Sequence, residues 1–200
     1  MVENKRVVIV GIPGVGKTTL VTTVVDKLNG DNKHASVKSY GTVMFEQAKK
    51  IGVNDRDGLR KLPVEKQKEL QKMAAEEISN LKDDVVFIDT HAFIASKSGF
   101  YPGLPNHVLQ ILQPTHFIII SAHPSEIFDR RMKDKTRNRD KISIGGIKNE
   151  LAIQESMLSS CSVLTGSPIK VILNNEGKVE EAADKVIKTI GYRRKIIEWE

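Results

Sequence analysis

Short runs of apolar residues alternate along this chain with longer segments in which apolar residues recur every three or four positions. Continuous apolar runs are typical of strands buried on both faces, and the recurring spacing is typical of helices with one buried face. The predicted strands span residues 6–10, 34–39, 85–89, 117–120 and 169–173. The predicted helices span residues 20–28, 43–50, 63–81 and 179–190. This alternation predicts an α/β fold with a five-stranded parallel sheet covered by helices on both faces.

The turn between the first predicted strand and the first predicted helix carries the most specific signal. Residues 11–18 read GIPGVGKT and match the phosphate loop G-x-x-x-x-G-K-[ST] of the P-loop NTPase fold, in the strand–loop–helix context that it requires. The amides of such a loop converge on an anion. Lys17 is expected to reach the β- and γ-phosphates of a nucleoside triphosphate, and Thr18 to bind magnesium. The loop residues expected at the triphosphate are Gly11, Ile12, Pro13, Gly14, Val15 and Gly16.

Two further groups of charged residues are candidates for phosphate chemistry. Asp89 ends an apolar strand, where it can hold magnesium directly or through water, or serve as a turn residue. Arg56 and Arg60 lie between two predicted helices, where they can grip a second phosphate group or form surface ion pairs. Residues 55–58 also match the D-x-x-G of GTPases, but they follow no apolar strand and the chain has no N-K-x-D motif, so we reject a GTPase switch.

The segment after the Asp89 strand is rich in turn-forming residues. Residues 98–105 read SGFYPGLP, and their prolines and glycines predict either a shaped loop at the ligand edge of the sheet or a plain connection. His91 and His107 flank this loop without partners at metal-ligand spacing. Each is expected to make a polar contact and not to bind a metal.

Length and composition narrow the class of protein. Two hundred residues suit one α/β domain, and 40% hydrophobic and 28% charged residues are ordinary for a soluble protein. No apolar run approaches the ~20 residues that span a bilayer, and no signal peptide fits, so we expect no membrane contact. The single cysteine, Cys161, agrees with a reducing cytoplasm and lies on a helical stripe that predicts a buried thiol.

The positive charge of the chain is concentrated in one segment. Residues 130–141 contain seven basic and two acidic residues, so they carry +5 of the net charge of +6. Since the phosphate loop already supplies an anion, we interpret this segment as a mobile lid that faces phosphate. A solvated turn and a nucleic-acid contact are the alternatives.

The sequence lacks one feature of kinases that act on hydroxyl groups. No H-R-D-type base occurs in a kinase context. A phosphate acceptor needs no base, because its oxygens are largely ionised at neutral pH. Several arginines without an evident base therefore favour a phosphate acceptor over a sugar or protein hydroxyl.

Several segments together resemble the archaeal-type adenylate kinases, a family of P-loop nucleoside monophosphate kinases. The matching stretches follow the family's order and are residues 11–19, 40–44, 55–57, 60–62, 88–91, 102–105, 136–140 and 163–166. The phosphate loop alone is generic, whereas the whole set is specific to the family.

The resemblance implies that the γ-phosphoryl group of ATP is transferred to AMP, giving two ADP, with Mg²⁺ as cofactor and a homotrimer as the assembly. It implies one P-loop kinase domain over residues 1–200, with an AMP-side segment at 40–81, a short basic lid at 130–142 and a tail at 192–200. By match, the catalytic residues are Lys17, Arg131, Arg137 and Arg139, and Thr19 joins those at ATP. The AMP-binding residues are Tyr40, Gly41, Thr42, Arg56, Arg60 and His91. Magnesium is held by Thr18 and, through water, by Asp89.

The chain also departs from the family pattern. The family often has a lysine where Ala95 stands, with Lys97 two positions later here, and we expect an arginine where this chain has Glu155. If that arginine contacts phosphate in relatives, another group does so here, or the acceptor differs. The rival interpretations are a kinase for another monophosphate, such as CMP or UMP, and a nucleic-acid-associated ATPase. The adenylate kinase interpretation requires no nucleic acid.

Overall fold

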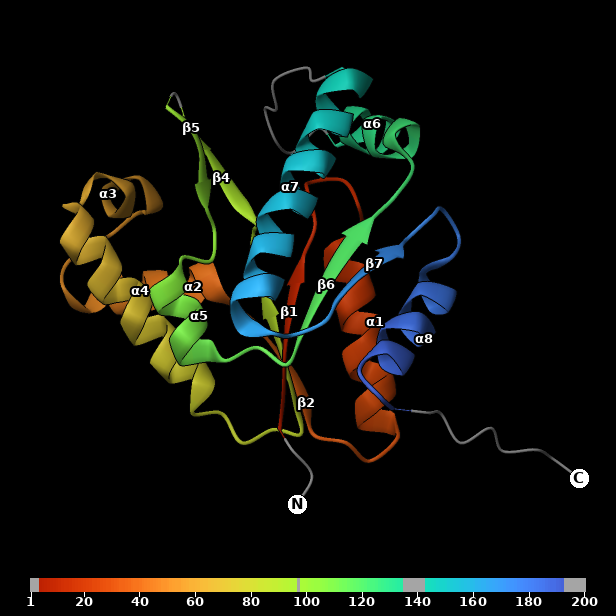
Figure 1. Cartoon of the computed structure of the whole chain (residues 1–200), viewed down its shortest axis with the longest axis horizontal. Coiled ribbons are helices and arrows are strands. Elements are labelled where there is room, and N and C mark those ends of the chain that lie inside the picture. Colours follow the sequence, from red (N-terminus) through yellow and green to blue (C-terminus); the bar gives the residue numbers. More distant parts are fainter. Residues whose placement is uncertain (1–3, 97, 135–142, 193–200) are drawn as a thin grey trace, which may run out of the picture.

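The computed structural model describes residues 4–96, 98–134 and 143–192, and it has a central sheet flanked by helices (Figure 1). The strands of the sheet are β1 (Lys5–Val10), β2 (Ala35–Ser39), β3 (Val85–Asp89), β6 (His116–Ser121) and β7 (Ile169–Leu173). The helices are α1 (Lys17–Gly30), α2 (Tyr40–Lys50), α3 (Arg56–Lys61), α4 (Val64–Ser79), α5 (Asn106–Leu112), α6 (Pro124–Lys133), α7 (Ile144–Thr165) and α8 (Val179–Thr189). None of the described helices is both long and apolar enough to cross a membrane.

The five strands are parallel and lie in the order β2-β3-β1-β6-β7, which confirms the predicted sheet. The chain leaves β1 in one direction to build β2 and β3, and it later returns on the other side of β1 with β6 and β7. The order of strands therefore reverses at β1. In open α/β sheets, ligands bind at this point, beyond the carboxyl ends of the strands. The loop of residues 11–16 leaves β1 there.

The side chains of β1 alternate between two hydrophobic cores, one on each face of the sheet. Val7 and Ile9 pack with α1 and α8, and Val8 and Val10 pack with α2, α4, α5 and the second half of α7. In Figure 1, α1 and α8 lie to the right of the sheet, and α2, α4 and α5 lie to the left. Cys161 of α7 is buried in the second core, as predicted. Burial of every β1 side chain from 7 to 10 holds the loop that follows on a rigid base.

The structure differs from the sequence expectations between residues 55 and 112. The turn-rich segment includes an antiparallel hairpin of β4 (Phe93–Ser96) and β5 (Gly99–Pro102), stabilised by edge-on packing of the Phe93 and Phe100 rings. Residues 56–61 form the short helix α3 because the Asp55 carboxylate accepts a hydrogen bond from the Gly58 amide. The D-x-x-G spacing of residues 55–58 is therefore that of a helix N-cap and the amide it binds three residues later. On α4, the sequence pattern also predicts that Met73 is buried with Leu70, Ala74 and Ile78, but its side chain is 37% exposed.

The base of the hairpin is closed by an unusually near approach of two backbone segments. The Gly103 amide donates to the Ala92 carbonyl oxygen at 2.9 Å. A Cβ atom at Gly103 would overlap the carbonyl oxygen of His91. Only glycine fits there, because the obstacle is backbone and cannot rotate away.

We expect Gly103→Ala to destabilise the fold, because the added methyl group must displace the backbone of the loop that carries His91. The free energy of unfolding should fall by about 1–3 kcal/mol, as for other overpacked sites. Urea unfolding followed by circular dichroism measures this change. Gly30→Ala is the matched control, since nothing lies within 4 Å of a Cβ there and alanine suits the end of a helix. Equal stability of the two variants would contradict the close approach.

Candidate active site

The phosphate loop connects β1 to α1 with its amide groups unoccupied by side chains. Gly14 and Gly16 have φ of +93° and +77°, in the left-handed region that favours glycine. Gly16 is the N-cap of α1, and no side chain among the described residues caps this helix end. The first amides of α1 are therefore available to an anion, and the helix dipole adds partial positive charge at the same point.

Lys17 and Asp89 form an ion pair beside this loop. They come from the start of α1 and the end of β3, which are adjacent because Ile9 of β1 pairs in register with Asp89. The Lys17 side chain is 13% exposed, and burial lowers its pKa from the usual 10.5 to about 8. The ammonium is therefore poorly hydrated, which strengthens its attraction to any anion that enters.

The Thr18 and Asp89 oxygens suit magnesium. Thr18 is exposed on the first turn of α1, and its hydroxyl makes no hydrogen bond to the described residues. The Asp89 carboxylate lies at the carboxyl edge of β3, with Lys17 as its ionic partner. Magnesium is commonly held by one or two protein oxygens together with phosphate oxygens and water, so this donor set fits the ion.

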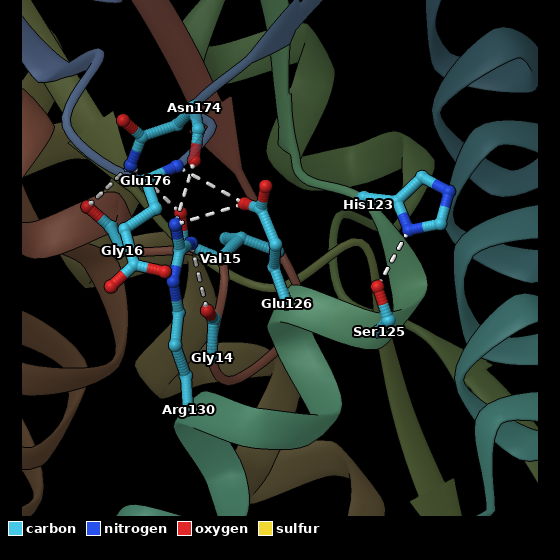
Figure 2. Close-up of polar contacts among 9 residues, drawn as sticks. All are labelled: Gly14, Val15, Gly16, His123, Ser125, Glu126, Arg130, Asn174 and Glu176. Carbon is cyan, nitrogen blue, oxygen red and sulfur yellow. Dashed lines mark hydrogen bonds and ion pairs between the residues drawn. The ribbon is translucent and has the colours of Figure 1, made fainter.

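The side of the loop away from these amides is held by residues from two other elements (Figure 2). The Asn174 amide nitrogen, from the loop after β7, donates to the carbonyl oxygens of Val15 at 2.9 Å and Gly16 at 3.4 Å. The Arg130 guanidinium of α6 donates to the carbonyl oxygens of Gly14 at 3.4 Å and Asn174 at 3.2 Å. These contacts clamp the loop between α6 and the end of β7.

Arg131, expected among the catalytic residues, lies in the same clamp. Its Nε donates to the Pro13 carbonyl oxygen at 2.7 Å, and its terminal nitrogen pairs with Glu150 of α7 at 2.7 Å. The side chain is 9% exposed. In this structure the guanidinium ties α6 and α7 to the loop, on the carbonyl side.

A second helix N-terminus without a side-chain cap among the described residues, that of α2, lies at the end of β2, two strands from β1 in the sheet. α2 begins at Tyr40 directly after β2, and the Ser39 side chain does not cap it, because its hydroxyl accepts from Thr42 at 3.1 Å. The Arg56 guanidinium donates to the Thr42 hydroxyl at 3.3 Å and lies over the Phe45 ring at 5.6 Å from its centroid. The structure thus brings Gly41, Thr42 and Arg56 together, as expected, and a Cβ at Gly41 would meet only the Arg56 guanidinium, at 3.6 Å.

The other expected AMP-side residues take different positions. Tyr40 is buried, its hydroxyl donates to the Gln71 carbonyl oxygen at 2.8 Å, and burial raises its pKa. Its side chain therefore joins α2 to α4, and the start of α2 presents backbone. Arg60 is exposed one turn after Arg56 and pairs with Asp57 at 3.1 Å. His91 is exposed on the loop after β3.

The strands that lead to the two helix N-termini, β1 and β2, are about 10 Å apart, because β3 lies between them and neighbouring strands are about 4.8 Å apart. Asp89 ends the strand between them, and it pairs in register with Ser39. Two anions bound at these ends would face each other across Asp89. This arrangement places a donor and an acceptor site on either side of one carboxylate at the same edge of the sheet.

Several sequence expectations fall on residues that the structure does not describe. Arg137, Arg139, most of the basic segment 130–142 and the tail from 193 onward lie outside the described residues, as does Lys97. Of the departures from the family pattern, Ala95 lies on β4 and Glu155 is exposed on α7.

Sequence reasoning missed most of the residues that bind the carbonyl groups of the phosphate loop. Asn174, Glu126 and Glu150 come from segments that the motif does not include. Arg130, expected in the lid at 130–142, lies on α6 and contacts the Gly14 carbonyl oxygen. One signal was available: Asn174 directly follows an apolar strand, as Asp89 does, so the parallel sheet places both at its carboxyl edge.

Comparison with known proteins identifies the family. A protein-family model described as an AAA domain matches residues 10–148. The chain is 39% identical over 190 residues to the adenylate kinase of Methanocaldococcus jannaschii, covering 94% of this chain and 99% of that protein. It is 43% identical over 186 residues to the adenylate kinase of Thermoplasma acidophilum, covering 92% and 98%.

Solved structures share the fold at low sequence identity. A shikimate kinase from Acinetobacter baumannii, in complex with shikimate, is 15% identical with a TM-score of 0.55, covering 93% of this chain and 92% of that one. A shikimate kinase from Bacteroides thetaiotaomicron is 16% identical with a TM-score of 0.53, covering 93% and 98%. These likenesses support the P-loop kinase fold, and the full-length identity to the curated relatives goes further: the chain belongs to the adenylate kinase family.

Proposed function

We propose that this protein transfers the γ-phosphoryl group of ATP to AMP, reversibly, to give two ADP. The observation that carries the proposal is the pair of uncapped helix N-termini at one edge of the sheet, α1 after β1 and α2 after β2, with Asp89 between them. ATP would occupy the first and AMP the second. Membership of the adenylate kinase family supports both assignments.

The chemistry in this proposal is positioning and charge compensation. The amides of residues 14–18 and the Lys17 ammonium hold the β- and γ-phosphates, and Thr19 extends this contact along α1. Transfer brings two polyanions together, and preorganised donors in a site sheltered from water offset their repulsion. No base is needed, since the acceptor oxygen is already ionised.

Magnesium belongs to the same proposal, because P-loop kinases generally use it with ATP. Thr18 would ligate the ion directly and Asp89 through water. When bound, the ion draws negative charge from the phosphate oxygens. Asp89, which now pairs with Lys17, would then face the hydrated ion, and the Lys17 ammonium would face the phosphates.

On the acceptor side, Arg56 is held in place by the Phe45 ring and the Thr42 hydroxyl, so its guanidinium needs little reordering to bind a phosphate. Arg60, one turn later on α3, would join it after leaving Asp57. His91 would make a polar contact to AMP. The backbone at Tyr40 and Gly41 contributes the helix N-terminus itself.

The remaining features of the proposal rest on the family resemblance. Arg137 and Arg139 are the lid arginines that would close over the phosphates of both nucleotides. The cytoplasm is the proposed location. The proposed assembly is a homotrimer, which exposed apolar side chains on the last turn of α7 and on the edge strand β7 support: Val163, Leu164, Val171 and Leu173.

The function is tested with a panel of nucleoside monophosphates, each incubated with ATP and magnesium and with no nucleic acid present. ADP formation should depend on AMP and be much slower with CMP, UMP or GMP. Faster turnover of CMP or UMP would assign the protein to another monophosphate. ATP hydrolysis that is stimulated by nucleic acid, without any response to a monophosphate, would refute the kinase.

The lowered pKa of Lys17 predicts how the reaction responds to pH. In the free enzyme the ammonium deprotonates above about pH 8, so kcat/KM for ATP should fall there by up to about tenfold per pH unit. Bound phosphates stabilise the ammonium, so kcat at saturating ATP should hold to higher pH. Initial rates between pH 6.5 and 10 measure both profiles. A kcat/KM for ATP that is flat to pH 10 would contradict the lowered pKa of Lys17.

Arg60→Ala should weaken the acceptor site selectively. Because a charge-assisted bond to one phosphate is lost, KM for AMP should rise by about tenfold or more, while KM for ATP changes little. Lys61→Ala is the matched control, since it removes an adjacent exposed positive charge. Equal effects of Arg60→Ala on both substrates would place Arg60 outside the AMP site.

A further inference from the structure

Four consecutive carbonyl groups of the phosphate loop accept hydrogen bonds from outside the loop. Pro13 accepts from Arg131, Gly14 from Arg130, and Val15 and Gly16 both accept from the side chain of Asn174. Figure 2 shows the Gly14, Val15 and Gly16 contacts, with the Arg130 guanidinium also reaching the Asn174 carbonyl oxygen. Of these three donors, only Asn174 serves two carbonyl groups of the loop, and it is 5% exposed.

Peptide geometry links these contacts to anion binding. In a planar trans peptide, the C=O of one residue and the N–H of the next point in opposite directions. A carbonyl group that is held toward Asn174 therefore turns the following amide away from Asn174. Through Val15 and Gly16, the Asn174 side chain sets the directions of the Gly16 and Lys17 amides, which lie at the start of α1.

The orientation of the Asn174 side chain is itself determined. Its two neighbours are carbonyl oxygens, which only accept, so the amide nitrogen must face the loop. Its backbone is held at both ends: its N–H donates to the Ser121 carbonyl oxygen at 2.8 Å, and its carbonyl oxygen accepts from Arg130. Glu126 completes this frame, since its carboxylate pairs with Arg130 at 3.2 Å and accepts from the Glu176 amide at 3.1 Å.

The contact between Asn174 and Gly16 is also tight. A Cβ atom at Gly16 would lie 2.6 Å from the Asn174 amide nitrogen. Two features therefore favour glycine at position 16: its φ of +77° and the close approach of the Asn174 side chain. A side chain at position 16 would therefore displace the Asn174 carboxamide.

We propose that Asn174 is a positioning residue for phosphoryl transfer: its carboxamide holds the Val15 and Gly16 carbonyl groups and so preorganises the Gly16 and Lys17 amides toward the phosphates of ATP. The inference deepens the proposed function and rests on ATP binding at this loop. Asn174 acts through the loop backbone and does not touch the nucleotide with its side chain.

The test compares Asn174→Asp with Asn175→Asp. Both variants add one negative charge at nearly the same place, but only the first replaces a donor with an acceptor that repels the two loop carbonyl groups. Asn175 is exposed and its side chain makes no hydrogen bond to the described residues. Calorimetry with ATP and with AMP, and initial rates in both directions, measure the effects.

We expect Asn174→Asp to raise the dissociation constant for ATP by at least tenfold and to lower kcat by about 10–100-fold, the scale for misplacing preorganised donors. The dissociation constant for AMP should change less than threefold, and Asn175→Asp should resemble the wild type. Asn174→Ala should have a smaller effect than Asn174→Asp, because it removes the donor without adding repulsion. Amide hydrogen exchange of residues 11–18 in the free enzyme should be faster in Asn174→Ala.

Two results would overturn the proposal. Equal losses in Asn174→Asp and Asn175→Asp would assign the effect to charge at a distance. Parallel losses of ATP and AMP affinity in Asn174→Ala, with a lowered melting temperature, would assign Asn174 a general structural role. ATP affinity is measured without the acceptor, so the role of Asn174 can be judged even if wild-type enzyme makes no ADP from AMP. Failure of the wild-type enzyme to make ADP from AMP would refute the proposed function and leave the role of Asn174 in ATP binding standing.

Discussion

A loop that turns its amide groups toward a phosphate must turn its carbonyl groups the other way, and those oxygens need donors of their own. In water the solvent would supply them, but this loop is packed against α6, α7 and the segment after β7. The protein supplies donors from Arg130, Arg131 and Asn174. The placement of these elements around the loop follows from that requirement, since an unsatisfied buried carbonyl group costs free energy comparable to a lost hydrogen bond. The binding site thus has two sides: a front, where the loop amides and Lys17 face the phosphates, and a back, where Arg130, Arg131 and Asn174 hold the loop carbonyl groups.

The parallel sheet provides the other half of the arrangement. Because β1, β2, β3 and β7 run in the same direction, their carboxyl ends bring the phosphate loop, the start of α2, Asp89 and Asn174 to one edge. Residues far apart in the chain become neighbours through strand order alone. At this edge the Lys17 ammonium attracts anions strongly, because it is buried enough to be poorly hydrated, and it pairs with Asp89.

The sheet and the front of the site could be predicted from the sequence for physical reasons. A buried parallel strand reads as an apolar run, and the loop GIPGVGKT needs its glycines, lysine and threonine in a fixed order. The hairpin at 93–102 could not be predicted in the same way. Its stability depends on packing of Phe93 against Phe100, and the positions of these two residues in the sequence do not reveal that contact. The back of the site was hidden for a similar reason. Asn174 meets Val15 across 159 residues of chain, and any polar residue after a strand gives the same local pattern.

The closure at Gly103 has a consequence for how this fold tolerates change. Because the Gly103 amide bonds to Ala92 beneath the hairpin, the chain enters and leaves residues 93–102 at nearly one point. The chain therefore passes from β3 to α5 through that point, and the far end of the hairpin at Gly99 is exposed. That turn is a natural place to graft a peptide tag, provided that the glycine at the neck is kept.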